Sequence, residues 1–497
     1  MTESGTNPAP DEPAWTAAWE LLLPAASAPA RRRGRTLQAA LREAVRSGRL
    51  APGTRLPASR ELAADLGVSR GLVTDTYEQL VAEGYLRAGR GSGTWVTPVG
   101  AQGAERGGPQ AEGWRADPQR PGGGRLPLAT PSLSFRPGTP DLSLFPRAAW
   151  NAAYRRVMSA LPHGRLGYPD PRGLPRLRNA LAALLVRRRG VVADPDRLIV
   201  CSGVSQALTL CGMVLHARGH RAVALEDPGS PPHGLQFAAT GIEPAGVAMD
   251  ADGLDLRALR RSGARLAVLT PSHQFPSGIA YSPQRRAGLL DWLHAGDHLI
   301  VEDDYDGEFR YDREPVGALQ GLDPERVLYT GSVSKSLAPG LRLGWMVAPS
   351  WLAAELTERK FRLDLGNSVL DQAVFADLVE RGEYDRHLRR TRREYKTRRD
   401  TLVAALAEHF PGAEVSGIAA GLHVIVTLPE GYGPERDFTA RALRAGVEVL
   451  GLSSYGTVPA GDPRVRLVLG YAHLAPSEIA HGVERLRAAS GFAGRNG

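Results

Sequence analysis

Hydrophobic and polar positions alternate between strand-like and helix-like spacing over most of the chain. From residue 132 onward, apolar runs rich in β-branched residues occur in the stretches RLIVCSG, AVLTPS, LIVEDDY and RVLYTGS, and stretches with helical spacing separate them. Strands that alternate with helices favour a mostly parallel sheet. We therefore expect residues 132–490 to form one α/β domain.

A shorter and denser pattern occupies residues 35–97. Ser59 and Ser69 precede the stretches RELAADL and RGLVTDTYEQLVAE, and a glycine follows each stretch, as is typical of helix ends. The second helix places three apolar residues on one face, the spacing of a core-packing stripe: Val73, Tyr77 and Leu80. The stretch YLRAGRGSGTWV predicts two short strands around a glycine-rich turn. Two helices followed by such a hairpin predict a winged helix-turn-helix.

Two segments show neither strand-like nor helix-like spacing of their apolar residues. Residues 1–34 are rich in Pro, Ala and small polar residues, and we expect them to form a mobile arm. Residues 98–131 contain eight Gly and six Pro. Because such a composition cannot bury a core, we expect these residues to form a flexible linker between the two patterned regions.

The length and the charge of the chain agree with this division. A chain of 497 residues is too long for one ordinary core. Its net charge of +8 permits nucleic-acid binding without requiring it. Residues 31–97 hold twelve Arg and six acidic residues, enough to sustain phosphate contacts, and a helix that begins at Ser69 and Arg70 can enter the major groove there. The alternative is a small three-helix domain with a solvated basic face.

Nothing in the composition indicates secretion or a membrane span. Cys201 and Cys211 are too few for a disulfide framework, and we expect buried thiols in a reducing compartment. The first fifteen residues carry three acids and no base, unlike a signal peptide, and no apolar run approaches the roughly 18 residues that span a bilayer. We expect a cytoplasmic protein.

The N-terminal pattern is specific enough to indicate a family. From Leu37 to Thr97, the stretch SGRLAPGTRLPASRELAADLGVSR and the GSGT of the wing resemble the DNA-binding domain of GntR-type bacterial regulators. The resemblance implies that Ser59 lies near a DNA phosphate and that Arg90 and Gly91 occupy the wing tip in the minor groove. The residues that it implies at the DNA are Arg60, Ser69, Arg70, Thr74, Arg90 and Gly91.

Lysine is rare in this chain, with only Lys335, Lys360 and Lys396 among 61 basic residues. Lys360 and Lys396 lie in highly charged, helix-like stretches, where we expect solvated cations. Lys335 lies instead among serines in the stretch TGSVSKSLAPGLRLGW. An amine in such a loop is a surface charge, a phosphate ligand or a Schiff-base nucleophile. The last of these needs a partly desolvated amine and a carbonyl cofactor such as pyridoxal phosphate.

The other groups that pyridoxal phosphate requires can be sought in the sequence. The stretch LIVEDDYDGEFRY ends a buried strand in Asp303, Asp304 and Tyr305. One acid there would keep the pyridine nitrogen protonated, and Tyr305 would bond the phenolic oxygen. We choose Asp303, because strand alternation points only one of the two acids inward. By itself, an acidic strand end is equally a metal site or a helix cap.

Candidate phosphate ligands occur on two segments. In CSGVSQALTL, a Gly-Ser turn precedes a helix, and Ser205 and Gln206 fall at the helix start, where free amides suit a phosphate. Around Lys335, the hydroxyls of Ser332 and Ser334 and the cation of Arg342 suit the same group.

Together these stretches resemble the fold-type I aminotransferases from Leu133 to Ala489. The resemblance implies that Lys335 forms the internal aldimine with pyridoxal 5′-phosphate and that Arg342 binds its phosphate. In LGYPDPRGLPRLRNALAALLVRRRG it implies that Tyr168 reaches the phosphate of the neighbouring subunit, and therefore a homodimer. In RVRLVLGYA it implies that Arg466 clamps a substrate carboxylate. The alternative is that this arginine, or Arg464, only decorates an edge strand.

Two positions depart from the aminotransferase pattern. Ser230 in EDPGSPPHG stands where many relatives have an aromatic residue that stacks on the pyridine ring, so stacking comes from elsewhere, such as His233, or is weaker. Phe275 in TPSHQFPSG stands where catalytic aminotransferases have an Asn that bonds the phenolic oxygen. Both changes disfavour fast transamination more than they disfavour cofactor binding.

The whole layout resembles the MocR/GabR subfamily of GntR regulators. It implies a transcription factor that binds double-stranded operator DNA with paired half-sites and senses pyridoxal phosphate, or a small amino compound, through Lys335. One rival is a working aminotransferase with an accessory DNA-binding domain, so the sequence leaves open whether the protein is an enzyme. A second rival is a DNA-binding scaffold without cofactor. No metal site is expected.

Overall fold

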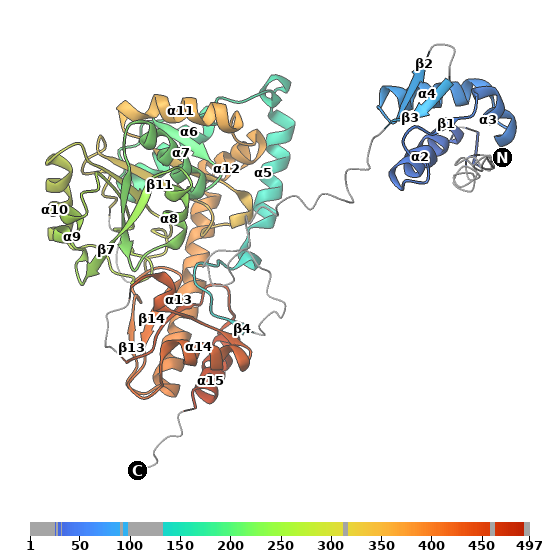
Figure 1. The fold of residues 1–497 in the computed structure, drawn as a ribbon. Helices are drawn as coiled ribbons and strands as arrows, with labels where there is room; N and C mark the ends of the chain where they lie inside the picture. The colour runs from blue at the N-terminus through green and yellow to red at the C-terminus, as the bar shows by residue number, and fades with distance from the viewer. Residues whose placement is uncertain are drawn as a thin grey trace, which may run out of the picture. The chain divides into compact units, whose positions relative to one another are not determined.

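The computed structural model describes residues 25, 28–30, 32–89, 93–97, 133–311, 317–457 and 463–491, which fall into two compact units divided near residue 116 (Figure 1). Most of the arm expected over residues 1–34 lies outside the described residues. The linker expected over residues 98–131 lies wholly outside them.

The N-terminal unit has the expected helices and wing. Helices α2 (Arg33–Arg46), α3 (Ser59–Leu66) and α4 (Arg70–Ala82) pack with an antiparallel sheet of order β1-β3-β2, formed by Arg55–Leu56, Gly93–Val96 and Leu86–Gly89. The three residues of the expected stripe on α4 are buried, which confirms their place in the core: Val73, Tyr77 and Leu80.

The two expected helix caps have different outcomes. The Ser69 side-chain oxygen accepts the Leu72 N–H at 3.3 Å, so Ser69 caps α4 as expected. The expectation that Ser59 caps α3 is wrong, because Ser59 is the first residue of that helix and Ala58 occupies the cap position. There the Glu61 carboxylate accepts the Ala58 N–H at 3.1 Å, so an acid in the first turn satisfies that end of the helix.

An eight-stranded sheet forms the centre of the larger unit. Its strand order is β5-β12-β11-β10-β9-β6-β7-β8, and only β12 and β8 run antiparallel to their neighbours. In chain order the strands are Leu198–Cys201 (β5), Ala222–Asp227 (β6), Glu243–Asp250 (β7), Gly253–Leu254 (β8), Leu266–Leu269 (β9), Leu299–Asp303 (β10), Val327–Ser332 (β11) and Gly344–Val347 (β12). This mostly parallel sheet confirms the expected fold class.

Helices cover both faces of this sheet. Side chains alternate along β5, so that Ile199 packs with α7 (Val204–Ala217) and α11 (Ser350–Asp364), whereas Val200 packs with α6 (Pro175–Arg189) and the opposite layer. The other helices of the sheet layers are α5 (Arg147–Ala160), α8 (Pro231–Ala238), α9 (Leu256–Arg261), α10 (Pro283–His294) and α12 (Val369–Glu380). A strand buried on both faces reads as a continuous apolar run, which explains the pattern in the sequence.

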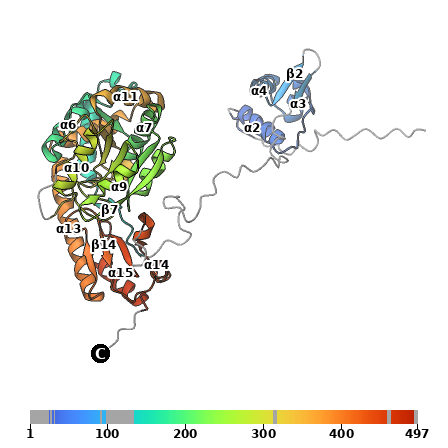
Figure 2. The same cartoon turned by 60° about the vertical axis from the view of Figure 1, so that its left-hand side comes forward.

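Helix α13 (Glu383–His409) runs from the large sheet to a smaller C-terminal part (Figures 1 and 2). That part contains the antiparallel sheet β13-β14-β17-β16, formed by Glu414–Ser416, His423–Thr427, Arg466–Gly470 and Leu450–Gly451. Helices α14 (Glu435–Arg444) and α15 (Pro476–Ala489) lie with it (Figure 2). The short strands β4 (Leu133–Ser134) and β15 (Val447–Glu448) pair beside it, so the first described segment of the unit joins its C-terminal part.

No helix within the described residues is long and apolar enough to cross a membrane.

Candidate functional site

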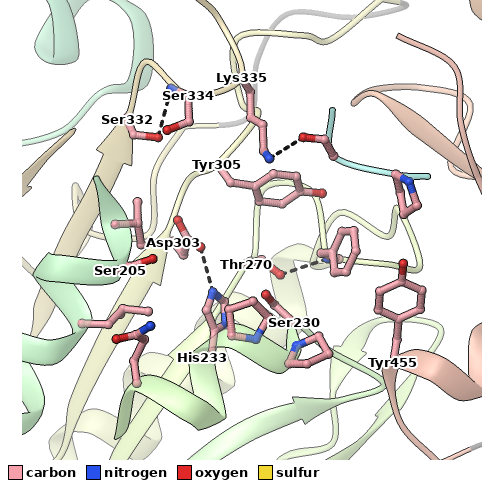
Figure 3. Close-up of a pocket in the computed structure, with 18 of the residues that line it drawn as sticks. Ser205, Ser230, His233, Thr270, Asp303, Tyr305, Ser332, Ser334, Lys335 and Tyr455 are labelled. Carbon is pink, nitrogen blue, oxygen red and sulfur yellow. Dashed lines mark hydrogen bonds and ion pairs between the residues drawn. The ribbon is translucent and has the colours of Figure 1, made fainter. Parts of the chain in front are cut away.

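A cavity of about 560 Å³ opens at the carboxyl ends of β10 and β11 (Figure 3). This position and volume are typical of small-molecule sites in α/β proteins. Segments far apart in the sequence supply its walls, from the loop after β4 to the 3₁₀ turn Leu452–Tyr455. The residues that line it include Arg136, Gly138, Ser205, Ser230, His233, Phe275, Asp303, Tyr305, Ser332, Ser334, Lys335, Arg342 and Tyr455.

Lys335 projects into this cavity from the loop after β11. Its ammonium nitrogen donates to the Gly138 carbonyl oxygen at 2.5 Å. Burial lowers the pKa of Lys335, and the nearby carboxylates of Asp306 and Asp303 oppose that change. A lowered pKa raises the fraction of neutral amine, which is the nucleophilic form. Lys335 therefore has the desolvated setting that a Schiff-base lysine needs.

Lys360 is not the solvated cation expected from the sequence, although Lys396 is exposed as expected. The Lys360 side chain is fully buried, and its nitrogen lies 2.8 Å from Asp364 Oδ2 and 3.3 Å from Gln206 Oε1. The charged residues beside Lys360 in the sequence make its side chain look exposed. The helical spacing indicates its burial, because Lys360 follows Leu352 and Leu356 at intervals of four on the buried face of α11.

The two acids at the end of β10 point to different surroundings. Asp303 Oδ2 lies 2.9 Å from Nε2 of His233, and both side chains line the cavity (Figure 3). Asp304 does not line this cavity: it forms a buried ion pair with Arg189 at 2.5 Å and accepts the Tyr329 hydroxyl at 2.7 Å. The choice of Asp303 as the partner of a ring nitrogen is compatible with this geometry and stays a proposal.

Aromatic rings enclose the centre of the cavity. The Tyr305 hydroxyl lies 3.0 Å from His273 Nδ1, and the Tyr305 ring meets the edge of Phe275 at 6.0 Å between centroids. Phe275 also meets Tyr455 edge to face at 5.1 Å. Phe275, which stands in the sequence where catalytic aminotransferases have an Asn, therefore presents an apolar ring to the cavity. Ser230 lines the cavity beside His233 and offers no ring.

One end of the cavity has the donors that a phosphate requires. Ser205 lies in the first turn of α7. The free backbone N–H groups of a first turn point outward from the N-terminal end of the helix, where they can bind an anion. Gly203 before it has φ 82°, and a Cβ there would lie 2.8 Å from Nη2 of Arg342. Ser332 and Ser334 line the same cavity as Arg342. The hydroxyls, the helix start and the guanidinium fit a dianionic phosphate, and only glycine leaves Arg342 its place.

Gln206 does not line the cavity. Its side-chain oxygen accepts the Ser202 N–H at 2.7 Å, and its amide nitrogen donates to Asp364 at 2.6 Å. The Arg342 guanidinium donates to the Ser202 carbonyl oxygen at 2.5 Å. Gln206 therefore supports the loop before α7 from behind, in contact with Lys360, and does not offer its own side chain to a ligand.

Two other expected site residues lie outside the cavity of a single chain. Tyr168 is 87% exposed. Arg466 begins β17, opposite Thr427, and does not line the cavity, so the structure does not bring it to Lys335. Arg136, which the sequence did not single out, lines the cavity instead.

The expected DNA-contacting residues belong to the N-terminal unit. Arg60, Ser69 and Arg70 are exposed, and the Thr74 hydroxyl bonds the Arg70 carbonyl oxygen at 3.0 Å. A concave surface there is lined by α3, α4 and both wing strands, including Ser59, Arg70, Thr74, Gly93 and Thr94. The wing-tip residues Arg90 and Gly91 lie outside the described residues.

Cys201 and Cys211 are buried free thiols, as expected, and burial raises the pKa of Cys201 to about 12. Within the described ranges, no three His, Cys, Asp or Glu side chains come together as metal ligands.

Comparison with known proteins gives a consistent result. Residues 138–486 match the family described as aminotransferase class I and II, and residues 34–96 match the bacterial regulatory proteins of the gntR family. The chain is 34% identical to the probable rhizopine catabolism regulatory protein MocR of Rhizobium meliloti, over 92% of this chain and 93% of that protein. It is 32% identical to the HTH-type pyridoxine biosynthesis transcriptional regulator PdxR of Corynebacterium glutamicum, over 84% and 87% of the two chains.

Solved aminotransferases share the fold of the larger unit. An archaeal alanine:glyoxylate aminotransferase superposes with a TM-score of 0.65 and 28% identity, over 72% of this chain and 90% of that chain. LysN, an α-aminoadipate aminotransferase from Thermus thermophilus complexed with N-(5′-phosphopyridoxyl)-L-leucine, superposes with a TM-score of 0.63 and 28% identity, over 72% and 91%.

Proposed function

The chain belongs to the MocR-type GntR transcriptional regulators, which join a helix-turn-helix domain to an aminotransferase class I and II domain, and we propose that its DNA binding responds to a ligand held at Lys335. The cofactor of its aminotransferase domain is pyridoxal 5′-phosphate. The ligand that changes DNA binding is this cofactor itself or a small amino compound that reacts where the cofactor is held.

The observation that carries the proposal is the buried amine of Lys335 in a cavity that also holds Asp303 and Arg342. Pyridoxal phosphate supplies an aldehyde that condenses reversibly with a primary amine. Lys335 would supply that amine, and Arg342 with Ser205, Ser332 and Ser334 would bind the phosphate. Asp303, which lies 2.9 Å from His233, would hold a proton on the ring nitrogen, and Tyr305 would offer its hydroxyl to the ring.

DNA recognition belongs to the N-terminal unit. GntR-family regulators bind double-stranded DNA, and the N-terminal end of α4, with Ser69 and Arg70 exposed, has the form of a recognition helix. We assign DNA contacts to Arg60, Ser69, Arg70 and Thr74 on this basis, and to Arg90 and Gly91 from the family resemblance.

A homodimer would present two such units to paired half-sites. Large apolar side chains are exposed on the segment that ends at Tyr168: Leu142, Tyr154, Met158 and Leu166. Exposed apolar side chains gathered on one segment support an interface, and a dimer formed there would let Tyr168 reach a second cavity. Linked DNA-binding units raise each other's effective concentration at paired sites, so a modest change in their arrangement alters occupancy.

A working aminotransferase is the second candidate, and the presence of Lys335, Asp303, Tyr305 and Arg342 in one cavity favours it. Phe275 favours the regulator, because an apolar ring cannot bond the phenolic oxygen of the cofactor. Steady conversion of an amino donor and a keto acid would distinguish the enzyme from a protein that reacts once per ligand bound.

The test is the binding of cofactor-free protein to the DNA upstream of its own gene at fixed salt, with and without pyridoxal phosphate. We expect the midpoint to shift on addition of the cofactor for the native protein and for Lys396→Ala, and not for Lys335→Ala. An unchanged native midpoint would remove the cofactor as the signal. A shift that Lys335→Ala retains would contradict the role of Lys335.

A further inference from the structure

The cavity holds one more cation than the cofactor requires. The charged side chains that line its described part are Arg136, Asp303, Lys335 and Arg342. In the proposed function, Lys335 binds the aldehyde and Arg342 the phosphate, whereas Asp303 is bonded to His233. Arg136 has no role in holding the cofactor. A guanidinium at a ligand cavity is suited to bind a carboxylate through two parallel hydrogen bonds.

The backbone that carries Arg136 is fixed. Its N–H donates to Ser134 Oγ at 3.3 Å, and the preceding Phe135 is fully buried and accepts the Gly470 N–H at 2.7 Å. A Cβ at Gly470 would lie 2.4 Å from the Arg136 carbonyl oxygen, so this close approach to β17 needs glycine. Gly138, two residues after Arg136, accepts the Lys335 hydrogen bond. One short segment therefore positions Arg136 relative to the reactive amine.

The Arg136 side chain has only a weak partner among the described residues. Its guanidinium lies 3.8 Å from Glu448 Oε1, and 58% of the side chain is exposed. Exposed pairs of this kind contribute about 0–1 kcal/mol. Glu448 is itself held by the Ser134 hydroxyl at 2.6 Å. A ligand carboxylate can therefore replace Glu448 as the partner of Arg136 at little cost.

The walls near Arg136 define the ligand further. Tyr455 meets Phe275 edge to face at 5.1 Å between ring centroids, and in Figure 3 Tyr455 lies across the cavity from Ser205, away from the phosphate end. Burial raises the pKa of Tyr455, and the Arg136 guanidinium opposes that rise, so the phenol and the cation are near each other. A ligand here meets an apolar wall, a hydroxyl and a cation.

We propose that Arg136 and Tyr455 bind the carboxylate of an amino-acid effector whose primary amine faces Lys335. This inference rests on the proposed function and assigns its effector to the amino carboxylic acids, in preference to simple amines. It also gives Arg136 the task that the sequence resemblance implied for Arg466.

The test titrates the full-length, cofactor-loaded protein with L-alanine, β-alanine and 4-aminobutanoate, each compared with propylamine and butylamine. The readout is the visible absorption of the bound cofactor, which changes when an amine replaces Lys335, whether or not turnover follows. For Arg136→Gln we expect about 10- to 100-fold weaker apparent affinity for the amino acid that native protein binds most tightly, with the simple amines unaffected.

Glu448→Gln is the matched variant, because it removes the competing charge and retains an acceptor for Ser134. We expect it to bind the same amino acid about two- to fivefold more tightly. Both variants should take up pyridoxal phosphate as the native protein does, which would exclude misfolding as the cause.

Two results would overturn the inference. One is that the native protein binds none of the amino acids more tightly than the simple amines. The other is that Arg136→Gln lowers the apparent affinity for both classes by the same factor. Failure of the proposed function looks different. In that case the amino-acid titration still depends on Arg136, but neither cofactor nor amino acid shifts the DNA-binding midpoint.

Discussion

Nε2 of His233 lies 2.9 Å from Oδ2 of Asp303, and both side chains are buried at the cavity wall. An imidazole that donates to a carboxylate fixes the carboxylate's orientation. The sequence alone suggests for His233 only the role of a replacement for a stacking ring. Its position indicates that it orients the acid proposed for the ring nitrogen.

Asp303→Asn should weaken pyridoxal phosphate binding about 10- to 100-fold, because a hydrogen bond to a charged group contributes about 1.5–3 kcal/mol. Equilibrium titration of cofactor-free protein, followed by absorption, measures this. The unfolding temperature without cofactor should change little.

Asp304→Asn is the matched control. It breaks the buried pair with Arg189 and should lower the free energy of unfolding by about 3–5 kcal/mol. The cofactor absorption of the folded fraction should stay native. If Asp304→Asn alters the cofactor spectrum and Asp303→Asn does not, the two acids have been assigned the wrong way round.

Lys335→Ala should abolish the visible absorption of the cofactor–lysine adduct and its trapping by borohydride, while basal DNA binding persists in the separate N-terminal unit. Lys396→Ala, which removes an exposed lysine, should retain both signals. Mass analysis of the borohydride-treated native protein identifies the modified residue. A label on Lys360 or Lys396 would show that Lys335 is not the receptor amine.

The pH dependence of cofactor uptake follows from the lowered pKa of Lys335. Burial disfavours the charged amine, so the neutral form accumulates at lower pH than for a lysine at the ordinary value of 10.5. The rate of uptake by cofactor-free protein should therefore rise with pH and level off below 10.5. Asp303 opposes the lowering, so Asp303→Asn should move the midpoint to still lower pH. A midpoint at or above 10.5 would contradict a desolvated amine.

Much of the fold followed from the sequence because its signals are local. Apolar runs predicted the buried strands, and Ser69 with the stripe on α4 predicted the recognition helix. The cap expected at Ser59 failed because Glu61 satisfies the same end of α3 from within the first turn. A capping serine and a first-turn serine look alike when the competing side chain is not weighed.

The site was harder to predict where long-range packing decides it. Charged neighbours made Lys360 look solvated, yet it is buried by contacts with Asp364 and Gln206. Arg136 lies nearly 200 positions before Lys335, and contacts with distant strands, among them the pairing of β4 with β15 and the bond from Gly470 to Phe135, place its segment beside the cavity. Such contacts between distant segments leave no periodic signal in the chain.

Arg70→Ala should weaken binding to specific DNA by about 1–3 kcal/mol if its guanidinium reads a base edge. Arg436→Ala removes one exposed positive charge from the larger unit and serves as the control. Midpoints on specific and unrelated DNA at one salt concentration separate the two effects. An equal loss on both DNAs would make Arg70 a phosphate contact.

Tyr168→Phe should weaken pyridoxal phosphate binding about two- to tenfold, because it removes one hydroxyl that we propose reaches the phosphate of the other subunit. Tyr154→Phe, on the exposed side of α5, is the control. Mixed dimers distinguish action across the interface from action within one chain. A Lys335→Ala subunit paired with a Tyr168→Phe subunit has one cavity that retains Lys335, and the partner's Tyr168 there is intact. That cavity should bind cofactor with native affinity, whereas weak binding in the mixed dimer would show that Tyr168 acts within its own chain.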